Sequence, residues 1–124
     1  MKVVEKKKII IIEDEIILAL ELKKYLERIG YIVSSIETNY KDIKNSFKKY
    51  LPDLMLLNIN LENNKENKNF LEEINKIKKV PFILTSSFTD IKTLKKAVPY
   101  NPSAFLVKPV NKEELRINIL LAFK

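Results

Sequence analysis

Short apolar runs alternate along this chain with longer segments in which apolar residues recur every three or four positions. The runs have the length of strands and lie at residues 9–12, 31–36, 52–61, 80–84 and 104–107. The helical spacing marks residues 15–29, 40–50, 70–77, 89–98 and 111–123. This alternation predicts an α/β fold in which five helices cover a parallel five-stranded sheet, because each parallel crossover needs a helix.

Glycine, proline and polar residues mark the ends of several of these elements. Gly30 is the only glycine in the chain and follows the first helical segment, where a helix C-cap favours glycine. Asn111, with Glu114 three residues later, resembles a capping box at the start of the last helix. Residues 62–69 are polar without an apolar period, so they are predicted to form an exposed loop.

The composition fits one compact domain over residues 1–124, with a core from about residue 8 to residue 123. The chain is 46% apolar and long enough to bury a core of useful size. It has no cysteine and no histidine, which excludes disulfides, thiolate metal sites and histidine-based hydrolase chemistry. No apolar run has the length of a membrane span and no signal-peptide pattern is present, so a cytoplasmic location is expected.

The formal charge of +7 raises the question of a nucleic-acid partner. Nearly all the basic residues are lysines, since Arg28 and Arg116 are the only arginines, and specific base readout favours arginine. The lysine clusters also lie far apart in the sequence. Direct nucleic-acid binding is therefore not favoured, and the lysines are interpreted as a solvated surface.

Polar residues with useful chemistry stand at the predicted ends of four strands. Glu13 and Asp14 follow the first run, Asn58 ends the third, Thr85 follows the fourth and Lys108 follows the fifth. Alone, each has a simpler interpretation, such as an acidic helix start or a solvated lysine. Together, carboxylates suit a hard divalent cation, while a hydroxyl and an ammonium suit phosphoryl oxygens. Ligands of open parallel sheets gather at the carboxyl ends of the strands, so a phosphoryl-binding pocket is predicted there.

Four motifs in this order resemble the receiver domain of two-component response regulators. They are Ile-Ile-Ile-Ile-Glu-Asp-Glu, Pro-Asp-Leu-Met-Leu-Leu-Asn-Ile-Asn-Leu, Pro-Phe-Ile-Leu-Thr-Ser and Phe-Leu-Val-Lys-Pro. The resemblance covers the chain from about Lys8 to Phe123. It implies a flavodoxin-like, doubly wound sheet with strand order 2-1-3-4-5. It also implies a histidine kinase or another signalling protein as partner, and it allows a homodimer through the fourth helix, fifth strand and fifth helix.

The resemblance assigns roles to the residues at the strand ends. Glu13 and Asp14 would hold Mg²⁺, with the carbonyl of Asn60 as a further ligand. Thr85 and Lys108 would contact the phosphoryl group, and Thr85 would also take part in switching. Members of the family carry out phosphoryl transfer to an aspartate at the end of the third strand.

Two further positions follow from the same resemblance. Phe105 would take the place of the aromatic switch residue, although a buried aromatic needs no such role. The peptide bond between Lys108 and Pro109 would be cis.

The sequence departs from this family at the phosphate acceptor, where it has Asn58. A neutral amide is not a nucleophile of the kind that forms an aspartyl-phosphate, and Asp53 lies at the wrong end of the strand to replace it. We therefore expect a receiver that is not phosphorylated in the normal way. We expect it to bind Mg²⁺ weakly, with Asn58 among the ligands. It would act as a protein-interaction module, not an enzyme. Two alternatives stay open: an active phosphate acceptor in which Asn58 replaced an aspartate or another side chain is used, and, less favoured, a nucleic-acid-binding domain.

Overall fold

A five-stranded parallel sheet forms the centre of the computed structural model, which describes residues 6–58, 66–87 and 91–124. The strands run in the order β2-β1-β3-β4-β5, which confirms the expected order. Their bounds are β1 (Lys8–Ile12), β2 (Ile32–Glu37), β3 (Leu54–Asn58), β4 (Phe82–Ser86) and β5 (Ala104–Val107).

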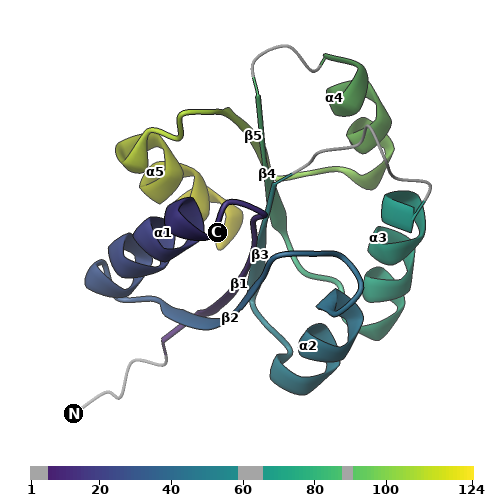
Figure 1. Ribbon diagram of the computed structural model, residues 1–124, viewed down its shortest axis with the longest axis horizontal. Coiled ribbons are helices and arrows are strands. Elements are labelled where there is room, and N and C mark those ends of the chain that lie inside the picture. Colours follow the sequence, from purple (N-terminus) through teal and green to yellow (C-terminus); the bar gives the residue numbers. More distant parts are fainter. Residues whose placement is uncertain (1–5, 59–65, 88–90) are drawn as a thin grey trace.

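Helices cover both faces of this sheet, with α1 and α5 on one side and α2 and α3 on the other (Figure 1). The helices are α1 (Ile16–Arg28), α2 (Ile43–Tyr50), α3 (Glu66–Ile77), α4 (Ile91–Ala97) and α5 (Lys112–Ala122), and a short 3-10 helix, η2 (Val98–Tyr100), follows α4. Among the described helices, none is both long and apolar enough to cross a bilayer.

The isoleucine run of β1 is apolar throughout because the strand contributes to two hydrophobic cores. Ile9 and Ile11 pack with residues of α1 and α5, while Ile10 and Ile12 pack with residues of α2 and α3. Successive side chains of a strand point to opposite faces, so a central strand covered on both sides has no polar face. The four side chains are at most 3% exposed, and the same holds for most of β3 and β4.

Two predicted helix starts were wrong. The helix α2 begins at Ile43 instead of residue 40, which leaves Tyr40 in the turn before it. The helix α3 begins at Glu66, within the segment 62–69 that was expected to be a loop. Glutamate and lysine have good helix propensity, so a first turn can form without any apolar period. The part of that predicted loop before Glu66 lies outside the described residues.

The predicted helix ends agree with the backbone geometry. Gly30 has a φ of 104°, a conformation that suits glycine directly after the last residues of α1. At the start of α5, the Asn111 side chain accepts a hydrogen bond of 2.9 Å from the backbone N–H of Glu114. This bond satisfies one of the donors that a helix leaves free at its start.

We expect Asn111→Ala to lower the free energy of unfolding by about 1 kcal/mol, because the N–H of Glu114 loses its partner. Urea denaturation followed by circular dichroism measures this change. Asn111→Asp, which keeps an acceptor oxygen, serves as the control and should stay close to the unaltered protein. An equal loss in both variants would show that the cap contributes nothing.

Candidate functional site

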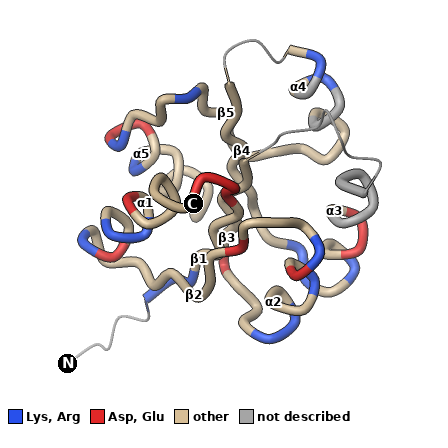
Figure 2. Tube along the Cα trace, in the orientation of Figure 1, with Lys and Arg blue, Asp and Glu red and all other residues tan. Residues whose placement is uncertain are grey.

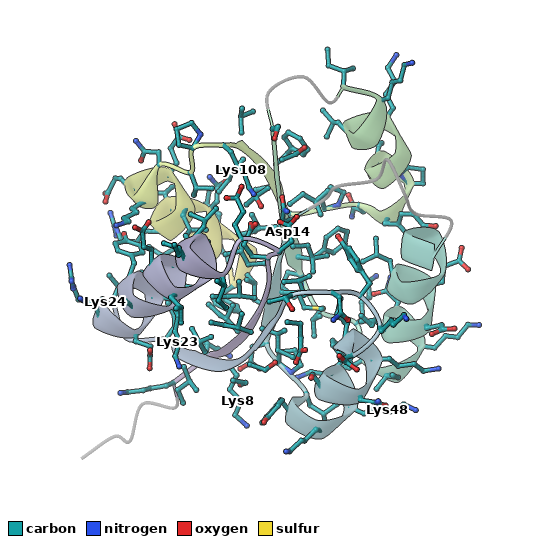
Figure 3. All side chains as sticks on the ribbon, viewed as in Figure 1. Lys8, Asp14, Lys23, Lys24, Lys48 and Lys108 are labelled. Carbon is teal, nitrogen blue, oxygen red and sulfur yellow. The ribbon has the colours of Figure 1, made fainter. Side chains whose placement is uncertain are left out.

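Four strand ends at the carboxyl edge of the sheet bring the predicted site residues together. Glu13 directly follows β1, Asn58 is the last residue of β3, and Lys108 directly follows β5. Asn58 and Thr85 are register partners in the neighbouring strands β3 and β4. Asp14 and Lys108 lie close to each other in Figure 3, whereas Lys8, at the other end of β1, lies well away from both.

Lys108 makes an ion pair with Glu13 in the centre of this group. Its Nζ lies 3.0 Å from Oε1 and 3.0 Å from Oε2 of the carboxylate. The Glu13 side chain is only 2% exposed and that of Lys108 17%. The backbone N–H of Glu15 donates a further hydrogen bond of 3.1 Å to Glu13 Oε1. The ammonium of Lys108 is therefore held by Glu13 and not by the residue at the end of β3.

Burial dominates the electrostatics of Glu13. Loss of solvent raises the pKa of its carboxyl above the ordinary value, and a hydrogen bond with Asp14 raises it further. The hydrogen bond and charge of Lys108, and the N–H of Glu15, act in the opposite direction. A buried carboxylate of this kind depends on its cation to remain ionised at neutral pH.

The side-chain amide of Asn58 is hydrogen-bonded to Asp14. Its Nδ2 donates a hydrogen bond of 2.9 Å to Oδ1 of Asp14, and the Asn58 residue is 9% exposed. The amide N–H thus interacts with the carboxylate oxygen that a cation would otherwise attract. This contact and the Lys108–Glu13 pair give each acid a donor within the protein.

Tyr40 is a member of the site that the sequence did not reveal. Its hydroxyl donates a hydrogen bond of 2.6 Å to the backbone carbonyl of Asn58. Burial, together with the negative charges of Asp14 and Glu13, raises the pKa of this phenol well above its usual range. Tyr40 was interpreted as part of the apolar face of a helix, and no sequence signal distinguished it from a core aromatic. In the fold it fixes the backbone at the end of β3.

Two residues predicted to take part in switching pack into the interior. Thr85 is 2% exposed, and its hydroxyl donates a long hydrogen bond of 3.5 Å to the carbonyl oxygen of Leu57. Phe105 is partly buried against the core that contains residues of α2 and α3. The peptide bond between Lys108 and Pro109 is cis, as expected. Asn60, the expected source of a carbonyl ligand, lies outside the described residues.

The site has oxygen atoms that suit Mg²⁺ as ligands, but it carries little net negative charge to attract the ion. Glu13, Asp14 and the carbonyl end of the Asn58 amide are all oxygen donors, which hard divalent cations prefer. One of the two carboxylates is already neutralised by Lys108. Within the described part of the chain, no three acidic, histidine or cysteine side chains come together as a metal-binding group. These residues therefore suit a weak Mg²⁺ site.

Asp53 lies at the opposite edge of the sheet from these residues. One of its oxygens accepts a hydrogen bond of 2.8 Å from the backbone N–H of Lys8, at the start of β1. Its other oxygen is 3.7 Å from Nζ of Lys78. Asp53 therefore cannot replace the missing carboxylate at the end of β3.

The chain is similar to known proteins in sequence and in fold. The family model for the response regulator receiver domain matches residues 9–120, whereas no curated protein sequence matches the chain. The signal receiver domain of a modulated diguanylate cyclase from Desulfovibrio desulfuricans G20 is 26% identical, with a TM-score of 0.84 over 95% of this chain and 94% of that one.

Two further solved structures are similar. The N-terminal domain of NsrR, a lantibiotic response regulator for nisin resistance, is 28% identical with a TM-score of 0.81, over 97% of this chain and 100% of that domain. A CheY-like receiver domain protein from Methanospirillum hungatei JF-1 is 22% identical with a TM-score of 0.82, over 94% and 93% of the two chains, and shows the shared fold. Because the family model matches most of its length, the chain belongs to the response regulator receiver domain family.

Proposed function

We propose that residues 1–124 form a single cytoplasmic receiver domain whose output does not depend on phosphorylation of residue 58. The observation that carries this proposal is the hydrogen bond from Asn58 Nδ2 to Asp14 Oδ1. Phosphoryl transfer onto the end of β3 needs an anionic oxygen, and a neutral amide does not supply one. The domain then acts in two-component signalling as a protein-interaction module, without catalysing its own phosphorylation.

The contacts around Asn58 support a site that is satisfied from within. Each acid of the pair Glu13 and Asp14 has a donor from the protein, which is Lys108 for the first and Asn58 for the second. Polar groups that are paired with one another, as here, favour one arrangement of their side chains. A receiver built in this way would stay in a single state when phosphodonors are present.

We also assign to this site a weak affinity for Mg²⁺, with Glu13, Asp14, Asn58 and the carbonyl of Asn60 as the residues that would hold it. When bound, the ion would neutralise negative charge at the carboxyl edge of the sheet. Thr85 and Lys108 are the groups that face a phosphoryl ligand in the family, and here Lys108 would have to leave Glu13 to do so.

The partner in this proposal is a histidine kinase or another signalling protein, and a second copy of the chain is an additional candidate. Support comes from apolar side chains that are exposed on α4, β5, η2 and α5. Ile91 is 66% exposed, Val98 59% and Val107 47%, and on α5 Leu120 is 53% exposed and Leu121 61%. Sedimentation velocity over a range of protein concentrations tests the homodimer, which a monomer at all concentrations would exclude.

Incubation with acetyl phosphate and Mg²⁺, followed by intact mass measurement, tests the lack of phosphorylation. We expect no phosphoryl adduct on the unaltered protein, because Asn58 lacks an anionic oxygen. Asn58→Asp is the matched control, and we expect it to gain one phosphoryl group under the same conditions. A stable adduct on the unaltered protein would contradict the proposal, and fragmentation would then locate the side chain that accepts the phosphate.

A further inference from the structure

Lysines that are far apart in the sequence meet at the edge of the sheet opposite the candidate functional site. Strands start at this edge, and the helices that lead into them end there. We call five lysines at this edge the basic edge: Lys7, Lys8, Lys49, Lys78 and Lys79. Lys7 precedes β1 and Lys8 begins it, Lys49 lies in the last turn of α2 before β3, and Lys78 and Lys79 follow α3 before β4. Sequence distance had suggested scattered clusters, and the parallel topology brings them together.

Direct contacts tie these segments to one another. The backbone N–H of Lys8 donates a hydrogen bond of 2.8 Å to Asp53, whose carboxylate is also 3.7 Å from Nζ of Lys78. Nζ of Lys78 donates to the carbonyl oxygens of Leu51, at 3.4 Å, and Pro52, at 3.2 Å, directly after α2. These contacts therefore join three segments into one continuous surface: the start of β1, the start of β3 and the end of α3.

Little negative charge faces this surface. Among the described residues, Asp53 is the one acid that makes an ion pair or hydrogen bond with the basic edge, and it pairs with the ammonium of Lys78 but with only the backbone N–H of Lys8. The ammonium groups of Lys7 and Lys49 lie over aromatic rings, 5.7 Å from the centre of Phe123 and 5.2 Å from that of Tyr50. Acidic residues, shown in red after β1 in Figure 2, follow the opposite end of that strand from Lys8. The positive charge of the basic edge is thus largely uncompensated.

A cleft of about 460 Å³ continues the basic edge toward β5. The residues that line it include Lys79, Phe82 at the start of β4, Tyr100 of η2, and Asn101 and Ser103 before β5. The Tyr100 hydroxyl donates a long hydrogen bond of 3.4 Å to Glu72, an acid beside the cleft. The cleft thus combines an ammonium group, the partly exposed ring of Tyr100 and hydrogen-bonding groups, whereas Phe82 is only 5% exposed.

We propose that the basic edge and this cleft bind a single-stranded nucleic acid through its phosphodiester backbone. Lysine ammonium groups bind phosphates as point charges without reading sequence, which suits the five lysines of the basic edge. An aromatic ring beside a basic track, here that of Tyr100, is the other component of single-strand binding, because every base has a face that stacks. A membrane surface is disfavoured, since the described helices end at this edge and none of them lies along it as an amphipathic helix.

Fluorescence anisotropy with a labelled single-stranded oligothymidine, over a series of salt concentrations, tests this proposal. The variant Lys7→Gln/Lys49→Gln/Lys79→Gln removes three charges from the basic edge and leaves Lys8 and Lys78, whose contacts hold the segments together, unchanged. We expect its dissociation constant to rise at least about tenfold at low salt. The slope of log K against log salt should fall by about 2, since each lost phosphate contact contributes about 0.7 for single strands.

The matched control is a variant with the same loss of charge at the opposite edge of the sheet. Its three lysines lie before or at the starts of α2, α4 and α5, and the variant is Lys41→Gln/Lys92→Gln/Lys112→Gln. We expect it to bind like the unaltered protein. Equal weakening in both variants would show that binding depends only on the net charge of the protein, and it would overturn the proposal. Binding that does not depend on salt, or no binding at all, would also overturn it.

Two further measurements keep the proposal testable if a variant folds poorly. Amide chemical shifts of the unaltered protein should change on oligothymidine addition at the basic edge and not around Asp14 and Lys108. Stronger binding to vesicles containing phosphatidylserine than to oligothymidine would identify a membrane surface instead and overturn the proposal. Asn58→Asp, which tests the proposed signalling function, should leave oligothymidine binding unchanged. A failure of one proposal can therefore be distinguished from a failure of the other.

Discussion

Replacing Lys108 with methionine is expected to lower the free energy of unfolding by about 3 to 5 kcal/mol at neutral pH. The ammonium group is 3.0 Å from both oxygens of Glu13, and the Glu13 side chain is 2% exposed. Methionine has a similar length but no charge, so the carboxylate would stay buried without its cation. Removing one partner of a buried pair costs much more than the net stabilisation of the pair, because the remaining charge is unpaired. Urea denaturation measures the loss.

The double variant Glu13→Gln/Lys108→Met is the control for this result. It removes both charges together, so it should recover most of the stability that Lys108→Met loses. Lys112→Met, at an exposed position at the start of α5, should have little effect. A loss below about 1 kcal/mol in Lys108→Met would show that the carboxylate reaches solvent when its partner is removed.

The pH dependence of this loss has a definite sign. Burial raises the pKa of Glu13 in the folded protein above its ordinary value of 4.5, so the folded state holds this proton more tightly than the unfolded state does. Ionisation of Glu13 therefore costs stability as the pH rises through the folded pKa. Lys108 opposes that shift, and its removal should raise the pKa further. The stability difference between Lys108→Met and the unaltered protein should shrink as the pH is lowered from neutral toward 4.5.

Much of the fold could be predicted because the sheet is buried on both faces. A strand such as β1, with isoleucine at four successive positions, has no polar side and cannot lie at a surface. Alternation with helical segments then requires parallel strands, and the polar residues after each strand must meet at one edge. Glu13, Asn58 and Lys108 could be assigned to a common site for this reason.

Side-chain partners could not be predicted in the same way, since several polar groups compete at short range. Nothing in the sequence indicates that Lys108 contacts Glu13, or that the amide of Asn58 turns its N–H toward Asp14. Tyr40 has the spacing of a core aromatic, and only the turn before α2 brings its hydroxyl to the backbone of Asn58. The convergence of the lysines at the basic edge was also hidden, because it depends on which strands are neighbours in the sheet.

Asn58→Asp is expected to weaken the metal-free fold and to strengthen Mg²⁺ binding. At present Oδ1 of Asp14 accepts an N–H from Asn58 at 2.9 Å. A carboxylate at this position would remove that donor and place a second negative charge against Asp14, with Glu13 close by. Like charges at this range destabilise one another in the absence of a cation, and the lost hydrogen bond adds to this effect. We expect a loss of about 1 to 3 kcal/mol without metal.

Magnesium should reverse this loss, because the additional carboxylate is also an additional ligand for the ion. Thermal melts with and without Mg²⁺ measure the effect, since a ligand that binds only the folded state stabilises it according to its affinity. Asn118→Asp adds the same charge on α5, away from the site, and its melting temperature should not respond to Mg²⁺. If Mg²⁺ raised the melting temperatures of Asn58→Asp and of the unaltered protein equally, the amide would be as good a ligand for the ion as the carboxylate. The weak metal affinity that we propose for this receiver could then not be attributed to Asn58.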